Sequence, residues 1–203
     1  MLFLMLPAVP TGHIHAHHHA VQFYTDDSEL FKTISSFLIE GLAAFQPAVV
    51  IATPDHTRAV LDELSARHID VAKARQLGDL VILDASETLS TFMVKGSPDP
   101  VHFRRNVGAV LEQAIRGRER TPVRAYGEMV DILWKKGQTD AAIKLEVLWN
   151  ELAGSYHFSL LCGYAMGSFY KQTSGIEAVM QQHTHVIGSS VVPVSAEKVE
   201  AVS

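Results

Sequence analysis

Polar and aromatic side chains gather in one part of the sequence, residues 123–164. An apolar, strand-like run there ends in YGE at residues 126–128, and a second one ends in CGY at residues 162–164. Both tryptophans of the chain, Trp134 and Trp149, lie between these runs, near acidic or amide side chains. Such groups at strand ends are what a small-molecule pocket in an α/β protein requires. The alternative for each tryptophan is a place in the hydrophobic core.

Two other apolar runs, 48–52 and 80–83, end in residues that could contact a ligand, Thr53 and Asp84. If Thr53 is the N-cap and Pro54 the first residue of a helix, His56 lies in its exposed first turn. The helix dipole there favours the neutral imidazole, which can donate to and accept from a polar or halogenated ligand. His56 could equally be an ordinary surface residue, and Asp84 could serve only as an N-cap.

The segment ATPDHTRA, residues 52–59, occupies the place where a nucleotide-binding protein would carry GxxxxGK[ST]. It has neither the glycines that let the backbone curl around a phosphate nor the lysine that follows them. Pro54 removes an amide donor, and Asp55 places a carboxylate where phosphate charge would lie. The sequence therefore predicts that the chain does not hydrolyse ATP.

Catalytic patterns are also missing from the sequence: it has no G-x-S-x-G, no H-E-x-x-H and no glycine-rich dinucleotide fingerprint. His157 and Cys162 are an odd number of residues apart on one predicted strand, so they face opposite sides and cannot form a nucleophile–base pair. Glu128 or Asp131 could do acid–base work with His56 only if the fold brings them together. We expect a protein that is not an enzyme, in which Cys162 is a buried, slow-reacting thiol.

Histidines alternate near the start of the chain, at His13, His15, His17 and His19. On a strand they would share one face, and imidazole suits Zn, Cu and Ni. His15, His17 and His19 are therefore metal-ligand candidates, and the alternative is a segment that binds metal adventitiously. His183 and His185 are two residues apart, which is not the spacing of a metal pair on a helix. The sequence specifies no cofactor.

The composition of the chain limits which classes of function remain. The chain has 203 residues, 47% of them hydrophobic, and a net charge of −5, which suits one domain with a sizeable core and argues against direct nucleic-acid binding. The single cysteine fits a reducing compartment. The apolar start of the chain lacks a basic flank and is too short to span a membrane. We expect a cytoplasmic protein with no membrane contact.

Strand-like and helix-like segments alternate along the chain. Strands are predicted at 20–24, 48–52, 80–83, 123–126 and 158–163. Three helices are predicted to begin after residues 26, 53 and 84. Further helices are predicted at 103–115, 130–135, 139–153 and 176–183. Apolar strands between helices predict an α/β fold with a mostly parallel sheet flanked by helices. The expected organisation is a histidine-rich tail (1–18), one domain (19–189) and a flexible tail (190–203).

Several long blocks, in order, resemble the methanogen/methylotroph (MEDS) sensory domain, a family first noticed in a dichloromethane-responsive repressor and in histidine kinases. The resemblance runs from about residue 19 to about residue 186 and is carried by HAVQFYTDDSEL, VVIATPDHTRAVLDEL, LDASETLSTFMVKGSPDPVHF, VRAYGEMVDILWKKG, AIKLEVLWNELA and FSLLCGY. It implies a RecA/KaiC-like, three-layer core that has lost its phosphate loop. It also implies a sensory role for small hydrocarbon derivatives.

Domains of this family usually accompany kinase, PAS or helix-turn-helix modules, and none of these is visible in the sequence. The resemblance thus implies that a ligand signal passes to a partner protein, such as a histidine kinase of a two-component system or a transcription regulator, or to the chain's own oligomer. The predicted ligand-binding residues are Thr53, His56, Asp84, Tyr126, Glu128, Trp134, Glu146, Trp149, Asn150 and Tyr164. We place the pocket between the helix that follows Thr53 and the helix that carries Trp149. The alternatives are a degenerate nucleotide-binding module and a metal-binding protein that uses the N-terminal histidines.

Overall fold

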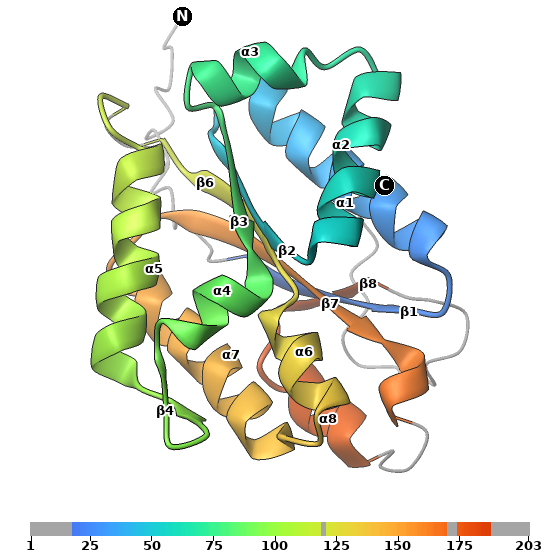
Figure 1. Ribbon diagram of the computed structural model, residues 1–203, viewed down its shortest axis with the longest axis vertical. Coiled ribbons are helices and arrows are strands. Elements are labelled where there is room, and N and C mark those ends of the chain that lie inside the picture. Colours follow the sequence, from blue (N-terminus) through green and yellow to red (C-terminus); the bar gives the residue numbers. More distant parts are fainter. Residues whose placement is uncertain (1–17, 119–120, 170–173, 188–203) are drawn as a thin grey trace, which may run out of the picture.

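A six-stranded sheet forms the centre of the protein in the computed structural model, which describes residues 18–118, 121–169 and 174–187 (Figure 1). The strand order is β3-β2-β6-β7-β1-β8, and every neighbouring pair is parallel. All carboxyl ends therefore lie along one edge. The strands are β1 (His19–Tyr24), β2 (Ala48–Ala52), β3 (Leu80–Asp84), β6 (Val123–Gly127), β7 (Phe158–Ala165) and β8 (His185–Ile187).

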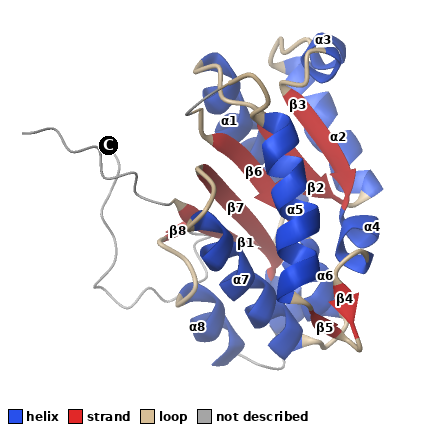
Figure 2. Ribbon diagram, turned by 90° about the vertical axis from the view of Figure 1, so that its left-hand side faces the viewer, coloured by secondary structure: helices blue, strands red, loops and turns tan. Residues whose placement is uncertain are grey.

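Helices cover both faces of the sheet and complete three layers. One face carries α1 (Asp27–Ala43), α2 (Pro54–Ala66) and α3 (Val71–Gln76). The other carries α4 (Ala85–Ser90), α5 (Pro100–Ala114), α6 (Met129–Lys135), α7 (Thr139–Ala153) and α8 (Ser174–Met180). In Figure 2, α5 and α7 lie in front of the strands. A short hairpin of β4 (Met93–Val94) and β5 (Ser97–Pro98), and a 3-10 helix over Met166–Phe169, lie outside the main sheet.

The alternation of side chains along the apolar strands divides the core into two. In β2, Val49 and Ile51 join the core under α4 to α8, whereas Val50 and Ala52 join the core under α1 to α3. Both sets are essentially fully buried. A continuous apolar run is therefore required here, because a strand covered on both faces has no side for polar residues.

Side-chain caps fix where several helices begin. Asp26 accepts a hydrogen bond from the amide of Ser28 at the start of α1. Asp84 does the same for the amide of Glu87 at the start of α4, as the sequence indicated. Thr53 precedes α2, with Pro54 in its first turn, but its side chain makes no capping hydrogen bond.

The predicted α/β class with a mostly parallel central sheet and three layers is confirmed. Four short features were not predicted: α3, the β4–β5 hairpin, the 3-10 helix and β8. The last helix ends at Met180, earlier than the predicted residue 183. Both expected tails lie outside the described residues, except for residue 18. In the described part of the chain, no helix has the length and apolar character needed to cross a membrane.

Candidate functional site

The carboxyl-terminal edge of the sheet brings His56 and Glu128 together, although they are far apart in the sequence. His56 lies in the first turn of α2, after β2, and Glu128 directly follows β6, which pairs with β2. The Nδ1 atom of His56 is 2.7 Å from the Oε2 atom of Glu128. The His56 side chain is 17% exposed and that of Glu128 only 4%. A ligand can reach a polar pair at the border between core and solvent. The limited exposure of the pair also keeps water from competing for its hydrogen bond.

Both carboxylate oxygens of Glu128 are held by further donors. The backbone N–H of Thr53 donates to Oε1 at 2.6 Å, and the hydroxyl of Tyr126 donates to Oε2 at 2.9 Å. Tyr126 is fully buried and comes from the same strand end. The site therefore contains four of the predicted residues, Thr53, His56, Tyr126 and Glu128, in one hydrogen-bonded group.

A second carboxylate extends this edge beside the neighbouring strands. Asp131 in α6 accepts from the backbone N–H of Ala165 at the end of β7 (3.1 Å) and lies 2.6 Å from the ammonium of Lys135. The hydroxyl of Tyr24, at the end of β1, donates to Asp131 at 3.5 Å. The rings of Tyr24 and Phe31 also contact the His56 imidazole edge to face. The edge thus combines aromatic walls with fixed polar groups.

The electrostatics favour a charged pair between His56 and Glu128. The hydrogen bond to Glu128 raises the pKa of His56, and this outweighs the opposing effect of burial. Burial raises the pKa of Glu128. The hydrogen bond and charge of His56 and the hydrogen bond from the Thr53 amide together lower it by more, so the net shift of the pKa is downward. The pKa of His56 thus shifts opposite to the direction that the helix dipole alone favours, because a carboxylate in direct contact outweighs the partial charge of a helix end.

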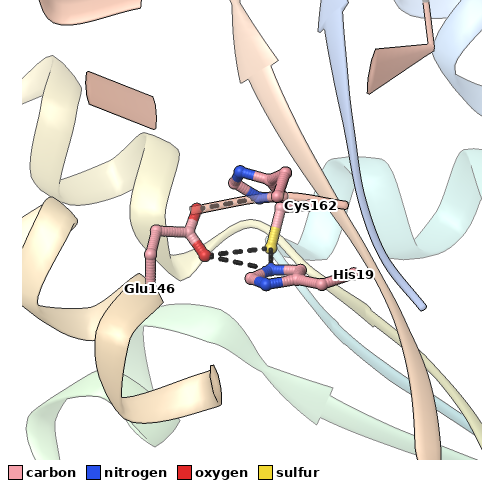
Figure 3. Close-up of side chains that lie close together, drawn as sticks. His19, Glu146 and Cys162 are labelled. Atoms are coloured by element: carbon pink, nitrogen blue, oxygen red, sulfur yellow. Dashed lines mark hydrogen bonds and ion pairs between the residues drawn. The ribbon is translucent and has the colours of Figure 1, made fainter. Parts of the chain in front are cut away.

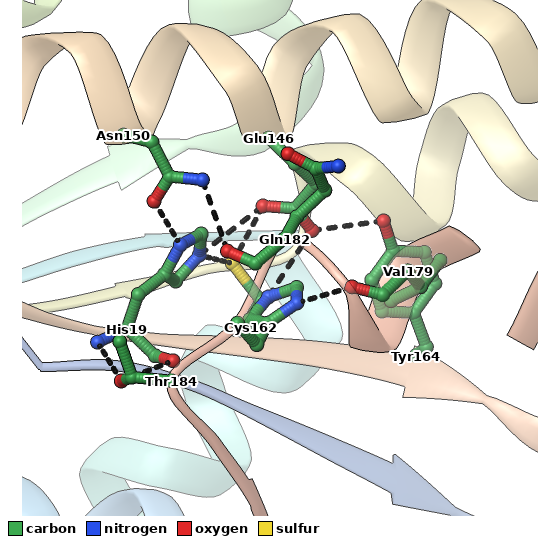
Figure 4. A network of polar contacts seen from close by, with 9 residues as sticks. His19, Glu146, Asn150, Cys162, Tyr164, Val179, Gln182 and Thr184 are labelled. Carbon is green, nitrogen blue, oxygen red and sulfur yellow. Dashed lines mark hydrogen bonds and ion pairs between the residues drawn. The ribbon is translucent and has the colours of Figure 1, made fainter. Parts of the chain in front are cut away.

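A second group of predicted residues lies elsewhere, between α7 and the sheet. Glu146 and Asn150, one turn apart on α7, meet Tyr164 of β7 and His19, the first residue of β1 (Figure 4). Two further residues complete this group, Cys162 of β7 and His183, which follows α8. The group is buried, and Glu146, His19 and Tyr164 have no exposed surface.

Short distances join the side chains of this buried group (Figure 3). The Nε2 atom of His19 is 3.2 Å from Oε2 of Glu146 and 3.4 Å from Sγ of Cys162. The Nε2 atom of His183 is 3.5 Å from Oε1 of Glu146, and Sγ of Cys162 is 3.5 Å from Oε2. The hydroxyl of Tyr164 donates to Oε1 at 2.9 Å.

The protonation states in this group follow from burial. Burial lowers the pKa of His183 to about 4, despite the nearby charge of Glu146. Burial, followed by the charge of Glu146, raises the pKa of the Cys162 thiol well above its usual range. Burial also raises the pKa of Glu146, but the two histidines and Tyr164 bring the net shift down. Burial therefore favours the neutral forms of His183 and Cys162 beside the Glu146 carboxylate.

The two tryptophans belong to the core, which is the alternative that the sequence left open. Trp149 is 1% exposed and packs edge to face against Phe103 and Phe158. Because Phe158 begins β7, Trp149 lies toward the amino-terminal edge of the sheet, whereas Thr53 follows the carboxyl end of β2. Trp134 packs against Tyr164 and Phe169. The structure therefore does not bring Trp149 and Thr53 into one pocket.

Asp84 lies at the same carboxyl edge, opposite Ala52 in the neighbouring strand, but its side chain caps α4 instead of joining the His56–Glu128 group. Of the metal candidates, His19 is in the buried group, and His15 and His17 lie outside the described residues. A hollow of about 590 Å³ lies at the opposite edge of the sheet, beside Gln46, Asp79 and other residues that precede β2 and β3.

Sequence reasoning missed His183 as part of a site and treated Cys162 only as an inert core thiol. No spacing rule joins residues 19, 146, 162 and 183, because β1 and β7 become neighbours only through the sheet order. The one available signal was chemical: histidine, cysteine and glutamate are rare in the interior unless they have partners.

A comparison with family models finds one match, described as "MEDS: MEthanogen/methylotroph, DcmR Sensory domain", over residues 18–184. This range includes all the elements from β1 to α8 and both groups of polar residues. A search of curated proteins finds no match.

Proposed function

The chain belongs to the MEDS family of sensory domains, and we propose that it is a non-catalytic sensor that binds a small organic ligand at the His56–Glu128 edge of the sheet. The ligand class is a small hydrocarbon derivative, in keeping with a family named for methanogens and methylotrophs. The observation that carries the proposal is the pair itself: a fixed, partly exposed imidazole hydrogen-bonded to a buried carboxylate at the carboxyl ends of parallel strands.

The chemistry of this edge suits a semi-polar molecule. The rings of Tyr24 and Phe31 beside His56 offer apolar contact. The imidazole of His56 donates through Nδ1 to Glu128, which leaves its Nε2 as the atom available to hydrogen-bond a bound molecule. A small ligand with one polar atom or halogen would use both features.

The same geometry argues against the nucleotide alternative. A phosphate would bind the N–H groups at the start of α2, but Pro54 has none, and the Thr53 N–H before it already donates to the Glu128 carboxylate. A phosphate there would also meet the negative charges of Glu128 and Asp55. Phosphate binding at this helix is therefore disfavoured by charge as well as by the loss of these two donors.

We propose that the output passes to a partner protein in signal transduction, such as a histidine kinase or a transcription regulator. All described elements belong to the sheet, to its covering helices or to short connections between them. Within the described residues, ligand binding at the edge would therefore be transmitted by shifts of two helices. These are α2, which carries His56, and α6, which begins after Glu128.

The proposal is tested by nuclear magnetic resonance of the chain with ¹³C-labelled histidine, titrated with dichloromethane, methanol, methylamine and, separately, ATP. We expect a one-carbon compound to shift the imidazole signal of His56 saturably and to leave that of His102 unchanged. His102 is a matched control, because it also lies beside a carboxylate, Asp99, at 3.2 Å but at a different helix.

In His56→Ala, the saturable shifts of neighbouring signals should disappear while the fold is retained. A shift of His56 by ATP alone would favour the nucleotide alternative. Saturable binding that leaves the His56 signal unchanged would place the ligand elsewhere.

A further inference from the structure

Four metal-ligating side chains converge in the buried group under α7: His19, Glu146, Cys162 and His183. They come from β1, α7, β7 and the turn after α8, and one ligand atom of each lies within 4.8 Å of the others. All four residues are buried, with exposed fractions from 0% to 6%. Four such groups rarely share an interior without a common partner, since each is costly to bury alone.

The spacing within the group is compatible with a tetrahedral metal. Zinc bonds to nitrogen, oxygen and sulfur are about 2.0–2.3 Å long, so adjacent ligand atoms of a tetrahedron lie roughly 3.3–3.8 Å apart. The separations are 3.2 Å for His19–Glu146, 3.4 Å for His19–Cys162, and 3.5 Å for both His183–Glu146 and Cys162–Glu146. The His183–Glu146 separation is also longer than a good N···O hydrogen bond.

The imidazole of His19 is oriented by a defined outer contact. The side-chain NH₂ of Asn150 donates to the carbonyl of Gln182 at 2.9 Å, which turns its oxygen toward His19. That oxygen lies 2.9 Å from Nδ1 of His19, so Nδ1 carries the proton. Nε2 is then the ring nitrogen that faces Glu146 and Cys162. A carbonyl oxygen that fixes the outer nitrogen of a histidine is the usual support of a metal ligand.

His183 is oriented in the same way. Its Nδ1 donates to the carbonyl of Val179 at 2.7 Å, which leaves the lone pair on Nε2. This buried Nε2 has no hydrogen-bond partner among the described residues, and the carboxylate oxygen of Glu146 that lies 3.5 Å away is itself an acceptor. Two acceptors that face each other in the interior require a cation or a proton between them.

Charge gives the same conclusion. The ligand set offers one carboxylate, one thiol that can bind as a thiolate, and two imidazoles. With a divalent cation bound, a carboxylate and a thiolate balance its two charges and both imidazoles stay neutral. The loaded site would be electrically neutral, as a fully buried site should be.

We propose that His19, Glu146, Cys162 and His183 form a structural site for a divalent transition metal, with Zn²⁺ as the best fit. Four protein ligands and full burial leave no open position for substrate, as in structural rather than catalytic zinc sites. The site would join the first strand, the α7 helix and the turn between α8 and β8 (Figures 3 and 4). It is independent of the proposed ligand edge, which uses none of these residues.

The experiment measures metal in the full-length, untagged chain with His13, His15 and His17 replaced by alanine, so that adventitious binding at these histidines is removed. We expect elemental analysis to find about one zinc per chain that survives gel filtration. After chelation and reloading with Co²⁺, the spectrum should show tetrahedral d–d bands and a thiolate-to-cobalt charge-transfer band.

Variants separate ligation from folding. Cys162→Ser keeps the size of the side chain, and it should retain the folded circular dichroism spectrum while losing the charge-transfer band. Asn150→Ala removes the outer support of His19, together with the hydrogen bond to the Gln182 carbonyl, and should weaken Co²⁺ binding about 10- to 100-fold. His185→Ala changes a neighbouring, exposed histidine and should leave metal content unchanged.

Three results would overturn the proposal. The first is that the chain with His13, His15 and His17 replaced by alanine folds but neither purifies with metal nor gives a tetrahedral Co²⁺ spectrum. The second is metal content that follows His13, His15 and His17 instead of the buried group. The third is a charge-transfer band that persists in folded Cys162→Ser.

Discussion

Replacing Glu128 by glutamine should destabilise the protein, because it removes the charge from the His56–Glu128 pair and one of the two acceptor oxygens while it keeps the shape of the side chain. The lost interaction is a 2.7 Å hydrogen bond between charged groups, with one partner 4% exposed. Hydrogen bonds to charged groups contribute about 1.5–3 kcal/mol and neutral ones about 0.5–1.5 kcal/mol. Since His56 keeps some access to solvent, we expect a loss of about 2 kcal/mol at the pH where both groups are charged.

The pH dependence of this loss follows from the two shifted pKa values. The pKa of His56 is raised from 6.5, so its contribution is complete below pH 6.5 and is lost as the pH rises through the folded value. The pKa of Glu128 is lowered from 4.5, so its contribution is present above pH 4.5 and is lost as the pH falls through the folded value. The pair therefore stabilises most between pH 4.5 and 6.5.

Urea unfolding of wild type and Glu128→Gln at about pH 5.5 and about pH 9 measures this difference. We expect Glu128→Gln to lower the free energy of unfolding by about 2 kcal/mol at the lower pH. At the higher pH, where a neutral His56 still donates a hydrogen bond, the loss should be about 1 kcal/mol. Asp99→Asn is the matched control, because asparagine can still cap α5 while the exposed pair with His102 loses its charge. A loss that is the same at both pH values, together with an unchanged His56 pKa in the variant, would refute the reasoning.

Three other expectations concern the thiol, nucleotide chemistry and close packing. Cys162 should react with a thiol reagent only at the rate of global unfolding, because it is 1% exposed and burial raises its pKa. ATP should be neither bound nor hydrolysed above background, because the Thr53 amide is already bonded to Glu128. Gly175→Ala should destabilise by about 1–3 kcal/mol, because the added Cβ would lie 2.4 Å from a ring carbon of Trp134.

Each of these expectations has a control and a contrary result. Rapid labelling of the folded protein would show that the thiol is accessible, and an ATPase rate that Asp84→Ala abolishes would restore a nucleotide function. For the glycine, Gly167→Ala is the comparison, since its Cβ would meet no atom within 4 Å. If both glycine variants unfold at the same urea concentration as wild type, the packing argument fails.

Much of the fold could be predicted because its signals are local. The continuous apolar run 48–52 reports a strand buried on both faces, and Asp26 and Asp84 report helix starts through their own hydrogen bonds. Short elements carry too few residues for a period to be visible, so α3 and β8 were missed. The order of the strands depends on which elements pack together, which no local pattern encodes.

Of the two groups of polar residues, only the one around His56 and Glu128 could be predicted from the sequence. Residues that follow strands share an edge in any parallel sheet, so Thr53, Tyr126 and Glu128 could be placed together. Trp149 also lies on an element near that block in sequence, but its helix runs back along the sheet and carries the side chain toward the other edge. The meeting of His19 with Cys162 depends on β1 pairing with β7, a contact across 143 residues. Such long-range pairing cannot be read from spacing.

The central claim is that the His56–Glu128 edge holds a small organic ligand. Native mass spectrometry of untagged wild type, His56→Ala and His102→Ala, each produced in the native host, tests it most directly. We predict a non-nucleotide adduct on wild type and His102→Ala that is absent from folded His56→Ala. A nucleotide adduct, or the same adduct at equal occupancy on all three proteins, would contradict the claim.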